Sequence, residues 1–415
     1  MSKNYIEIMS PAGNFEALTA AIQGGANAVY FGVGELNMRS HSANNFTIDD
    51  LPEIVSRCNE GGVKSYLTLN IVLFDEDIEP MKNTIEAAKK AGVTAVIASD
   101  MSAILHSRKI GMEVHISTQL NISNAESVRY HSEFADVMVL SRELNLIQIK
   151  AISDTILRDS ITGPSGELVR LELFCHGALC MAVSGKCYLS LHETGASANR
   201  GNCYQICRRG YEVTDVETNR QLLVDNKYIM SPKDLSTIEF LDKIIEAGIT
   251  VLKIEGRARS ADYVKTVTSA YRRGVDAYFE GKYDDALKAE LKNETAKVFN
   301  RGFWDGYYQG AKLGQWSEVY GNKATKRKIY TGKVTNFFSN LSVAEVLVET
   351  GEFTIGSHIL IMGPSTGVVE MIVEELRVDL KSVEKAVKGE YCSIPVKEGV
   401  KLRRSDKIYL WNDID

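Results

Sequence analysis

The amino-acid sequence predicts an α/β fold, a (β/α)8 barrel of the TIM type in residues 1–280, followed by a small β-barrel domain in residues 330–415. Three observations support this prediction. Short apolar runs alternate with amphipathic segments through the first part of the chain, glycines placed to end helices precede several runs, and the apolar period becomes two near Tyr330. Residues 281–329, rich in aromatic side chains and glycine at 299–308, are expected to form a connector with helical and aromatic character.

Eight apolar runs have the length of buried strands. They lie at residues 5–9, 28–31, 65–69, 95–98, 114–117, 137–140, 171–174 and 251–254. Between them are helical segments such as 14–23, in which Asn14 is placed to cap a helix and Phe15, Leu18 and Ile22 recur on one face. Glycines suited to a left-handed helix end precede later runs at Gly25, Gly92 and Gly248. A doubly wound sheet is the alternative, but no G-x-G-x-x-G follows the first run.

Polar side chains follow the predicted strands. Catalytic and binding groups of (β/α)8 barrels lie at the carboxyl ends of the strands. The residues just past the runs are Ser10, Pro11, Gly32, Asn70, Ser99, Asp100, Thr118, Gln119, Ser141, Arg142, Cys175, His176 and 255–257. From this group and its neighbours, we predict a substrate-binding set of Asn70, Gln119, Glu255, Arg257, Arg39 and His115.

The amino-acid composition and net charge restrict the kinds of protein that the chain can be. The chain is 44% apolar and 25% charged, as expected of a soluble globular protein, and its net charge is −6, which argues against a protein that coats nucleic acid. No apolar signal region begins the chain and no run is long enough to span a bilayer, so we expect a cytoplasmic protein without a membrane partner. Two local basic segments, 323–328 and 401–404, are either nucleic-acid contacts or ordinary solvated surface.

Four of the seven cysteines cluster in one segment: Cys180, Cys187, Cys203 and Cys207. Free thiols gathered this densely in a reducing compartment predict a soft-metal site. Only Cys203 and Cys207 have the close spacing of a zinc knuckle, and the wider spacing of the other two favours an iron–sulfur cluster over zinc. Reduced structural cysteines are the remaining alternative. The cluster lies in a predicted insertion after the seventh run, residues 176–233, which is much longer than an ordinary loop.

The segment around the first two cysteines resembles the signature of peptidase family U32, the collagenase-like proteases. The matching residues are Glu172, Phe174, Gly177, Ala178, Cys180, Gly185, Cys187 and Ser190. Further segments similar to this family are 9–14, 28–32, 198–203, 253–257 and the C-terminal β-domain. The resemblance is greatest to the tRNA hydroxylation protein P branch.

The resemblance implies a function other than the peptidase activity that the family name suggests. Members of the family include RNA and quinone hydroxylation factors whose paired cysteines hold a [4Fe–4S] cluster. The tRNA branch implies formation of 5-hydroxyuridine at the wobble position of tRNA, with prephenate as a required metabolite. We therefore expect a tRNA hydroxylation enzyme that binds tRNA and a small anionic metabolite, with Cys180, Cys187, Cys203 and Cys207 as cluster ligands.

Two other functions stay open. The first is a peptidase, as the family name suggests. The chain contains one G-x-S-x-G, at Gly363–Gly367, but it lies between two β-runs, whereas a nucleophile elbow needs a strand-to-helix turn. No H-E-x-x-H occurs. The second alternative is a metal-stapled scaffold, without activity of its own, for an RNA-modifying enzyme.

Several residues have alternative interpretations. His176, beside the cysteine segment, and Glu255, at the end of the last strand, are the candidate catalytic residues. Arg257 is expected to hold a carboxylate or phosphate, or else to form an internal ion pair. His115 either lines the mouth or is a packing histidine inside its strand. Arg39 is expected to face the mouth.

Overall fold

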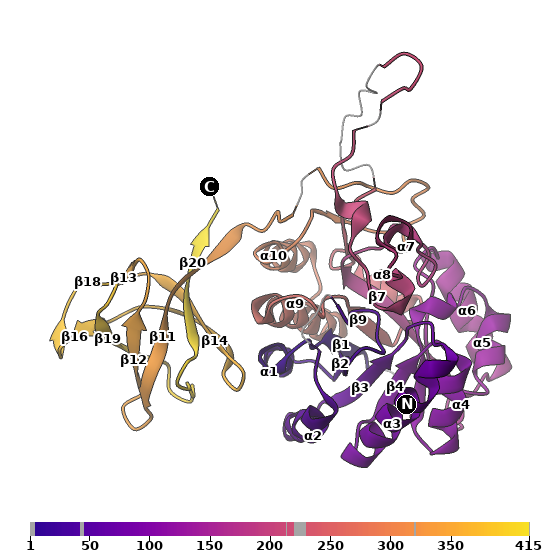
Figure 1. Ribbon diagram of the computed structural model, residues 1–415, viewed down its shortest axis with the longest axis horizontal. Helices are drawn as coiled ribbons and strands as arrows, with labels where there is room; N and C mark the ends of the chain where they lie inside the picture. Colours follow the sequence, from indigo (N-terminus) through magenta and orange to yellow (C-terminus); the bar gives the residue numbers. More distant parts are fainter. Residues whose placement is uncertain (1–4, 42–44, 213, 220–229, 319–320, 415) are drawn as a thin grey trace.

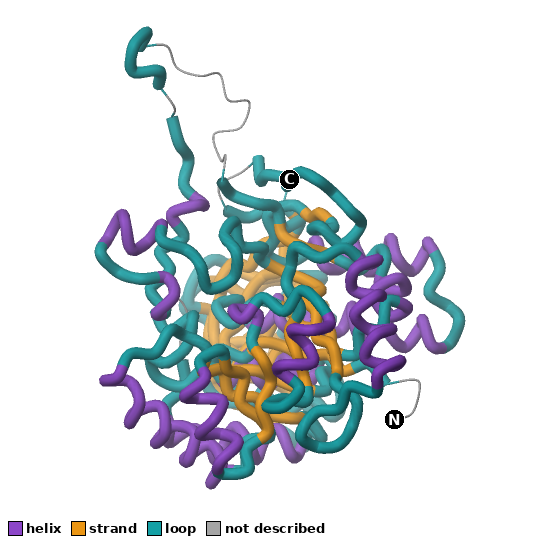
Figure 2. Tube along the Cα trace, turned by 90° about the vertical axis from the view of Figure 1, so that its right-hand side faces the viewer, coloured by secondary structure: helices purple, strands orange, loops and turns teal. Residues whose placement is uncertain are grey.

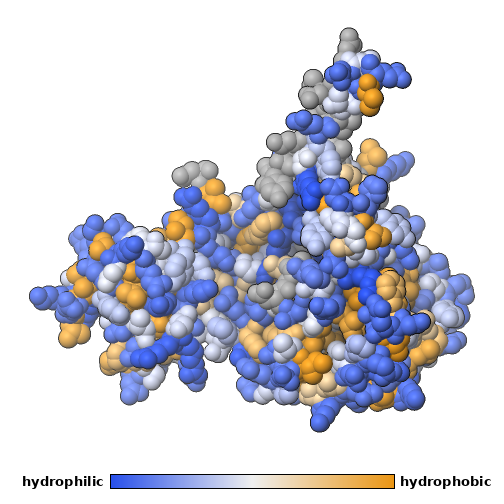
Figure 3. All heavy atoms as spheres, in the orientation of Figure 1, coloured by the Kyte–Doolittle hydropathy of each residue, from blue (hydrophilic) through white to orange (hydrophobic). Residues whose placement is uncertain are grey.

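The computed structural model describes residues 5–41, 45–212, 214–219, 230–318 and 321–414. The chain forms a barrel and an antiparallel β-domain, which lie side by side along the longest axis of the molecule (Figure 1). Among the described residues, no helix is long and apolar enough to cross a membrane. Hydrophilic side chains cover much of the visible face of the β-domain (Figure 3).

Eight parallel strands close into a ring. They are β1 (Glu7–Pro11), β2 (Ala28–Phe31), β3 (Lys64–Leu69), β4 (Ala95–Ala98), β5 (Glu113–Ile116), β6 (Val137–Val139), β7 (Arg170–Gly177) and β9 (Val251–Ile254). Each pairs with the next, and β9 closes the ring because it pairs with both β7 and β1. The closure confirms the (β/α)8 prediction and excludes the open doubly wound sheet. Each of the eight predicted runs overlaps one of these strands.

Helices surround the strands (Figure 2). They are α1 (Phe15–Gln23), α2 (Leu51–Glu60), α3 (Ile78–Ala91), α4 (Met101–Lys109), α5 (Ala125–His131), α6 (Leu146–Asp159), α8 (Leu241–Glu246) and α9 (Ala261–Phe279). Polar side chains cap the N-termini of several of these helices. The side chain of Asn14 accepts a hydrogen bond from the Ala17 amide at 2.8 Å, as predicted. Gly92 ends α3 in the left-handed conformation, with φ of 90°.

The interior of the barrel is unusually polar near the N-terminal ends of its strands, opposite the mouth. At the N-terminal ends of the odd-numbered strands, Glu7 pairs with Lys64 at 3.3 Å and with Arg170 at 3.0 Å. The next layer holds Tyr66 and His115, whose ring centroids lie 4.5 Å apart. Apolar and aromatic side chains fill the rest of this inner core: Met9, Ala28, Tyr30, Ala95, Ile97, Val137 and Val251.

A long crossover joins β7 to β9 and carries the four clustered cysteines. It contains α7 (Leu189–Thr194), two single turns at Ala198–Arg200 and Ile206–Arg208, and β8 (Asp234–Ser236), which runs antiparallel to the end of β7. The predicted insertion at 176–233 corresponds to this crossover, although 213 and 220–229 lie outside the described residues. The crossover lies over the carboxyl ends of the barrel strands, because its residues and those strand ends line one cavity.

The predicted connector returns across the same end of the barrel. After α10 (Asp285–Ala296), the short strand β10 (Phe303–Trp304) pairs in parallel with β8. The Trp304 indole donates a hydrogen bond to the Lys233 carbonyl at 3.1 Å, and Trp316 forms an isolated bridge with Pro232. The aromatic side chains of the connector thus fasten the end of the cysteine-bearing crossover.

The C-terminal domain is antiparallel, as predicted, and its first strand begins at Lys326. Its strands are β11 (Lys326–Phe338), β12 (Val343–Val348), β13 (Glu352–Thr354), β14 (His358–Gly363), β15 (Gly367–Ile372), β16 (Arg377–Val378), β17 (Lys381–Ser382), β18 (Lys385–Val387), β19 (Tyr391–Pro395) and β20 (Lys407–Asp413). The sheet order is β15-β14-β20-β11-β12-β19-β16-β17, with β13 and β18 as a separate pair. The domain has its own apolar core around Val346, Phe353 and Ile361.

The turn that joins β14 to β15 docks on the barrel. The Pro364 carbonyl accepts a hydrogen bond from the Thr19 hydroxyl at 2.8 Å, and the Thr366 carbonyl accepts one from the Gln23 side chain at 2.7 Å. Both barrel residues belong to α1. The G-x-S-x-G sequence, Gly363–Gly367, is therefore a β-hairpin turn that joins the two domains, and Ser365 is exposed in it.

Candidate active site at the barrel mouth

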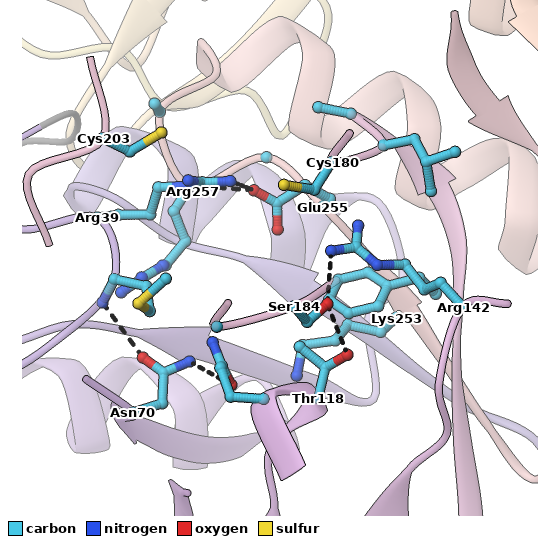
Figure 4. Close-up of a pocket in the computed structure, with 18 of the residues that line it drawn as sticks. Arg39, Asn70, Thr118, Arg142, Cys180, Ser184, Cys203, Lys253, Glu255 and Arg257 are labelled. Carbon is cyan, nitrogen blue, oxygen red and sulfur yellow. Dashed lines mark hydrogen bonds and ion pairs between the residues drawn. The ribbon is translucent and has the colours of Figure 1, made fainter. Parts of the chain in front are cut away.

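A cavity of about 190 Å³ lies at the carboxyl ends of the barrel strands, beneath the cysteine-bearing crossover (Figure 4). Side chains from the strand ends and from the crossover share its lining. Four of the six predicted substrate-binding residues lie in one layer of it: Arg39, Asn70, Gln119 and Glu255. Arg257 also lines it, so five of the six predictions converge on one cavity.

The cavity is strongly cationic. Seven basic side chains line it: Arg39, Arg142, Arg208, Lys253, Arg257, Arg259 and Arg301. Three have carboxylate partners, because Arg39 pairs with Glu255, Lys253 with Glu172 and Arg301 with Asp234. Among the described residues, the other four make no ion pair with a carboxylate. An excess of positive charge in a partly enclosed site favours an anionic ligand.

Glu255 is held as a carboxylate by Arg39. The Nε and Nη2 atoms of Arg39 donate to Glu255 Oε1 at 3.2 and 2.7 Å. Burial alone would favour the neutral acid, but the charge and hydrogen bonds of Arg39 lower the pKa of Glu255 to about 2. Glu255 is therefore ionised at neutral pH, and a role as a general acid does not suit it.

Arg257 is buried without a carboxylate partner. Its Nη1 donates to Asn37 Oδ1 at 2.9 Å and to Thr68 Oγ1 at 2.8 Å. Burial lowers the pKa of its guanidinium to about 10. The backbone at Gly32 passes so close that an added Cβ would lie 2.5 Å from Nη1, so a side chain there would displace Arg257. The predicted alternative, an internal ion pair, is not formed among the described residues.

Asn70, Gln119 and Ser117 form a hydrogen-bonded group in the lining of the cavity. Asn70 Nδ2 donates to Ser117 Oγ at 3.2 Å and to Gln119 Oε1 at 3.4 Å. The side-chain oxygen of Asn70, Oδ1, in turn accepts a hydrogen bond from the Met38 amide at 3.2 Å. This last contact positions the loop after β2, which carries Arg39.

Arg142 and Lys253 were not among the predicted site residues. Arg142 Nη2 donates to Ser184 Oγ at 2.9 Å, and its guanidinium lies 5.0 Å from the Phe174 ring centroid. It lies three residues after the end of β6, in the segment just past the sixth predicted run, so the position rule that selected Asn70 also applies to it. Lys253 points inward from within β9, where an apolar side chain is usual. The only sequence feature that could have identified it as a site residue is its charge within an otherwise apolar run.

Three of the four clustered thiols line the cavity: Cys180, Cys203 and Cys207. Cys187 lies close to them, since Cys180 and Cys203 both act electrostatically on its thiol. Burial, together with the neighbouring thiols, raises the pKa of Cys207 to about 11, although the nearby Arg208 opposes this shift. Among the described residues, no three His, Cys, Asp or Glu side chains converge closely enough to bind a single metal ion. Three thiols therefore share the lining of one cavity, and the fourth lies close to them.

Close backbone contacts fasten the cysteine segment to the mouth. Gly185, with φ of 71°, lies against Gln119, where an added Cβ would be 2.7 Å from Cγ. Asn199 Oδ1 accepts a hydrogen bond from the Cys187 amide at 3.2 Å. Arg200 pairs with Asp77 at 2.6 Å and lies 3.9 Å from the Phe74 ring centroid. These contacts position the thiols over the strand ends.

Two predicted site residues do not line the cavity. His176 is packed among Tyr263, Tyr271 and Phe303, with ring centroids 5.3–6.1 Å away, and burial lowers its pKa to about 3. It is neutral and faces away from the mouth. His115 lies deeper in the barrel, fully buried beside Tyr66. For His115, the packing alternative therefore describes its position better than the mouth-lining one.

The sequence model of peptidase family U32 matches residues 13–318. The chain belongs to peptidase family U32. This U32 member is 56% identical over 409 residues to a collagenase of Porphyromonas gingivalis (strain W83), a match that covers 99% of this chain and 98% of the relative.

Other relatives have names that refer to RNA. The chain is 34% identical over 381 residues to tRNA hydroxylation protein P1 of Bacillus subtilis, covering 89% of this chain and 87% of the relative. It is 37% identical over 321 residues to the 23S rRNA 5-hydroxycytidine C2501 synthase of Escherichia coli, covering 76% of this chain and 47% of the relative. The family resemblance predicted from the cysteine signature is thus confirmed.

Proposed function

We propose that this U32 protein is a tRNA uridine hydroxylation enzyme that forms 5-hydroxyuridine at the wobble position, with a [4Fe–4S] cluster at the barrel mouth. The observation that carries the proposal is the cavity itself, which combines clustered thiols with seven basic side chains. Relatives named as tRNA and rRNA hydroxylation proteins support RNA as the substrate class.

The donor set fits an iron–sulfur cluster. Cys180, Cys187, Cys203 and Cys207 would hold it, and their arrangement around a cavity suits a cluster with separated metal corners better than one zinc ion. Basic neighbours such as Arg39 and Arg208 would balance the charge of the thiolates. When bound, the cluster would supply electron transfer or Lewis acidity.

The arginines that lack carboxylate partners would bind and orient a small organic anion. Nη1 of Arg257 is engaged by Asn37 and Thr68, which leaves Nε and Nη2 for a carboxylate. Arg142, held by Ser184 on the far side of the cavity, supplies a second positive group. Prephenate, which carries two carboxylates, is our proposed ligand.

A second hollow beside the mouth suits the RNA backbone. It is about 490 Å³ and is lined by Arg208, Arg209 and Arg301 together with Tyr204, which is 53% exposed. Guanidinium groups bind phosphates, and an exposed aromatic ring can stack on an unpaired base. The basic segment 323–328 is less suited than we expected, because Lys323, Lys326 and Lys328 pair with Glu318, Asp413 and Asp262.

A peptidase is the second candidate, because a relative with 56% identity is named a collagenase. The one nucleophile motif, at Gly363–Gly367, is a β-hairpin turn that contacts α1, and none of its residues lines the mouth cavity. A metal-stapled scaffold remains the non-enzymatic alternative. It would show the same cluster content but no turnover of its own.

Mass spectrometry of tRNA nucleosides from a strain that lacks the gene tests the proposal. We expect 5-hydroxyuridine and its derivatives to be lost, to return with the wild-type gene, and to stay absent with Cys203→Ser. Cys392→Ser, a change in the separate core of the β-domain, is the matched control and should restore the nucleoside. Unchanged tRNA nucleosides in the deletion strain would contradict the proposal. A gelatin-cleavage assay on the same purified protein addresses the peptidase alternative.

A further inference from the structure

A line of ionisable side chains runs along the barrel axis, from the cavity to the opposite end. We call it the axial column: Lys253, Glu172, His115 and Glu113. Lys253 lines the cavity, and its Nζ lies 2.7 Å from Glu172 Oε1. His115 Nδ1 lies 4.0 Å from Glu172 Oε2, and His115 Nε2 lies 3.2 Å from Glu113 Oε1.

The two ends of the axial column differ in exposure. Glu172 and His115 are fully buried, whereas the side chain of Glu113 is 36% exposed at the N-terminal end of β5. The column therefore joins the mouth cavity to solvent on the other side of the barrel. Interiors of such barrels are usually filled by branched apolar side chains, and a buried ion pair seldom stabilises a protein more than apolar replacements do. Stability does not account for this arrangement.

The middle of the axial column contains two unsatisfied atoms that face each other. His115 Nδ1 and Glu172 Oε2 are both buried without a hydrogen-bond partner. A buried polar atom left without a partner destabilises the fold. Their separation of 4.0 Å is too long for a hydrogen bond. If either side chain gains a proton between these atoms, a small movement forms the missing bond and satisfies both.

We propose that the axial column relays protons between solvent at the N-terminal end of the barrel and a ligand in the mouth cavity. The inference does not require that the reaction be a hydroxylation. It identifies Lys253 as the proton donor of the cavity, and His115 and Glu172 as positioning and relay residues behind it.

The proton balance is simple. The Lys253 ammonium gives one proton to a basic oxygen of the bound anion and becomes an amine. His115 starts in the neutral Nδ1–H form, takes a solvent proton at Nε2 by way of Glu113, and passes its Nδ1 proton to Glu172 Oε2. The Glu172 carboxyl returns a proton to Lys253, and a turn of the His115 ring restores the Nδ1–H form. One proton moves from solvent to the ligand, and each group recovers its starting charge.

Other charged groups surround the relay. His115 is faced by the Tyr66 ring from β3, by Glu172 from β7 and by Glu113 on its own strand. Glu7 from β1 also acts on it, and Glu7 itself is held by Arg170 and Lys64. Burial opposes the charge of Glu7, but Arg170, Lys64 and the Tyr66 hydroxyl together lower its pKa. The charge of Glu7 is thus balanced by two cations, and Arg170 Nη2 also lies 3.9 Å from Glu113 Oε1.

Nuclear magnetic resonance of the full-length protein with ¹⁵N-labelled histidine tests the relay without an activity assay. The ring N–H signals of His115 are assigned by their loss in His115→Gln. His176 is the internal control, because it is equally buried but is surrounded by aromatic rings and has no carboxylate partner in the described structure. We expect the His115 ring proton to exchange with water at least about tenfold faster than that of His176.

Two variants locate the path. Glu113→Gln should slow the exchange of the His115 proton by about tenfold, because it removes the acceptor at the solvent end. Lys253→Met should change the ring ¹⁵N chemical shifts of His115, because Glu172 loses its cation and turns to His115. If His115 exchanges as slowly as His176, or ignores both variants, it is a static packing residue and the relay does not exist.

Discussion

Arg39 donates two hydrogen bonds to one oxygen of Glu255, which among the described residues is the one carboxylate that lines the mouth cavity. Four other basic side chains of the lining, those of Arg142, Arg208, Arg257 and Arg259, have no carboxylate partner in the described part of the chain. The pKa of Arg39 is raised mainly by Glu255, and the thiols of Cys203 and Cys180 add smaller contributions. Arg39 therefore interacts electrostatically both with Glu255 of the barrel and with the thiols of the cysteine segment.

Arg39→Met should make the stability of the protein depend differently on pH. The pKa of Glu255 is lowered in the folded protein, so its contribution is present above its ordinary value of 4.5 and is lost as the pH falls toward about 2. The variant should be less stable than wild type at neutral pH, and the difference should shrink in acid. Urea unfolding at a series of pH values measures it. Arg158→Met, at an exposed pair, should leave stability nearly unchanged at every pH. An Arg39→Met difference that is constant with pH would contradict this account.

The four clustered cysteines should each be needed for iron. Protein purified without oxygen should be brown and hold about four iron and four sulfide per chain, by the stoichiometry of a cubane. Cys→Ser changes at 180, 187, 203 and 207 should each lower the iron content, whereas Cys392→Ser should not. Metal analysis and visible absorption measure both. A colourless anaerobic preparation with one zinc per chain would refute the cluster.

Arg257→Lys should weaken binding of a dicarboxylate. Lysine keeps the charge but loses the fork that contacts Asn37 and Thr68 while leaving other N–H groups for the ligand. A charge-assisted hydrogen bond is worth about 1.5–3 kcal/mol, which corresponds to about a ten- to hundredfold loss of affinity. Calorimetry with prephenate measures it, with iron content as the check on integrity. Wild-type affinity in the variant would show that Arg257 only supports the loop after β2.

Ser365→Ala should leave any peptide cleavage unchanged. Ser365 is exposed in the β14–β15 turn, and that turn contacts α1 through backbone carbonyls that the substitution leaves intact. Wild type and variant are compared for gelatin cleavage after identical purification, which controls for contaminating proteases. Cleavage that disappears only in the variant would identify a serine peptidase and overturn our proposal.

Strand positions could be predicted from the sequence because buried parallel strands are short, apolar and separated by capped helices. The same rule, applied to residues just past each strand, placed Asn70, Gln119 and Glu255 at the mouth. It failed for His176 because the pairing of β7 with β9 shifts its register between Phe174 and His176. Phe174 points into the cavity, and the irregularity turns His176 toward α9. No sequence pattern marks such a shift.

His115 was misplaced for a different reason. Its side chain does point into the barrel, as alternation along β5 requires, but it lies beside the Tyr66 ring and does not reach the cavity lining. Depth along the barrel axis depends on the stagger between neighbouring strands, which the sequence does not reveal. Arg208 and Arg301 were beyond prediction because they reach the mouth through the crossover and the connector, whose paths have no regular period.

The place of the four thiols in the chain has a consequence for how the protein is made. They lie between β7 and β9, the last two members of the closed ring, so during synthesis all four leave the ribosome before the strand that completes the barrel. Until β9 emerges, seven strands have unpaired edges at β1 and β7, which are open to wrong partners. Ring closure and maturation of the thiol site therefore share one interval of biosynthesis, in which the nascent chain is most vulnerable.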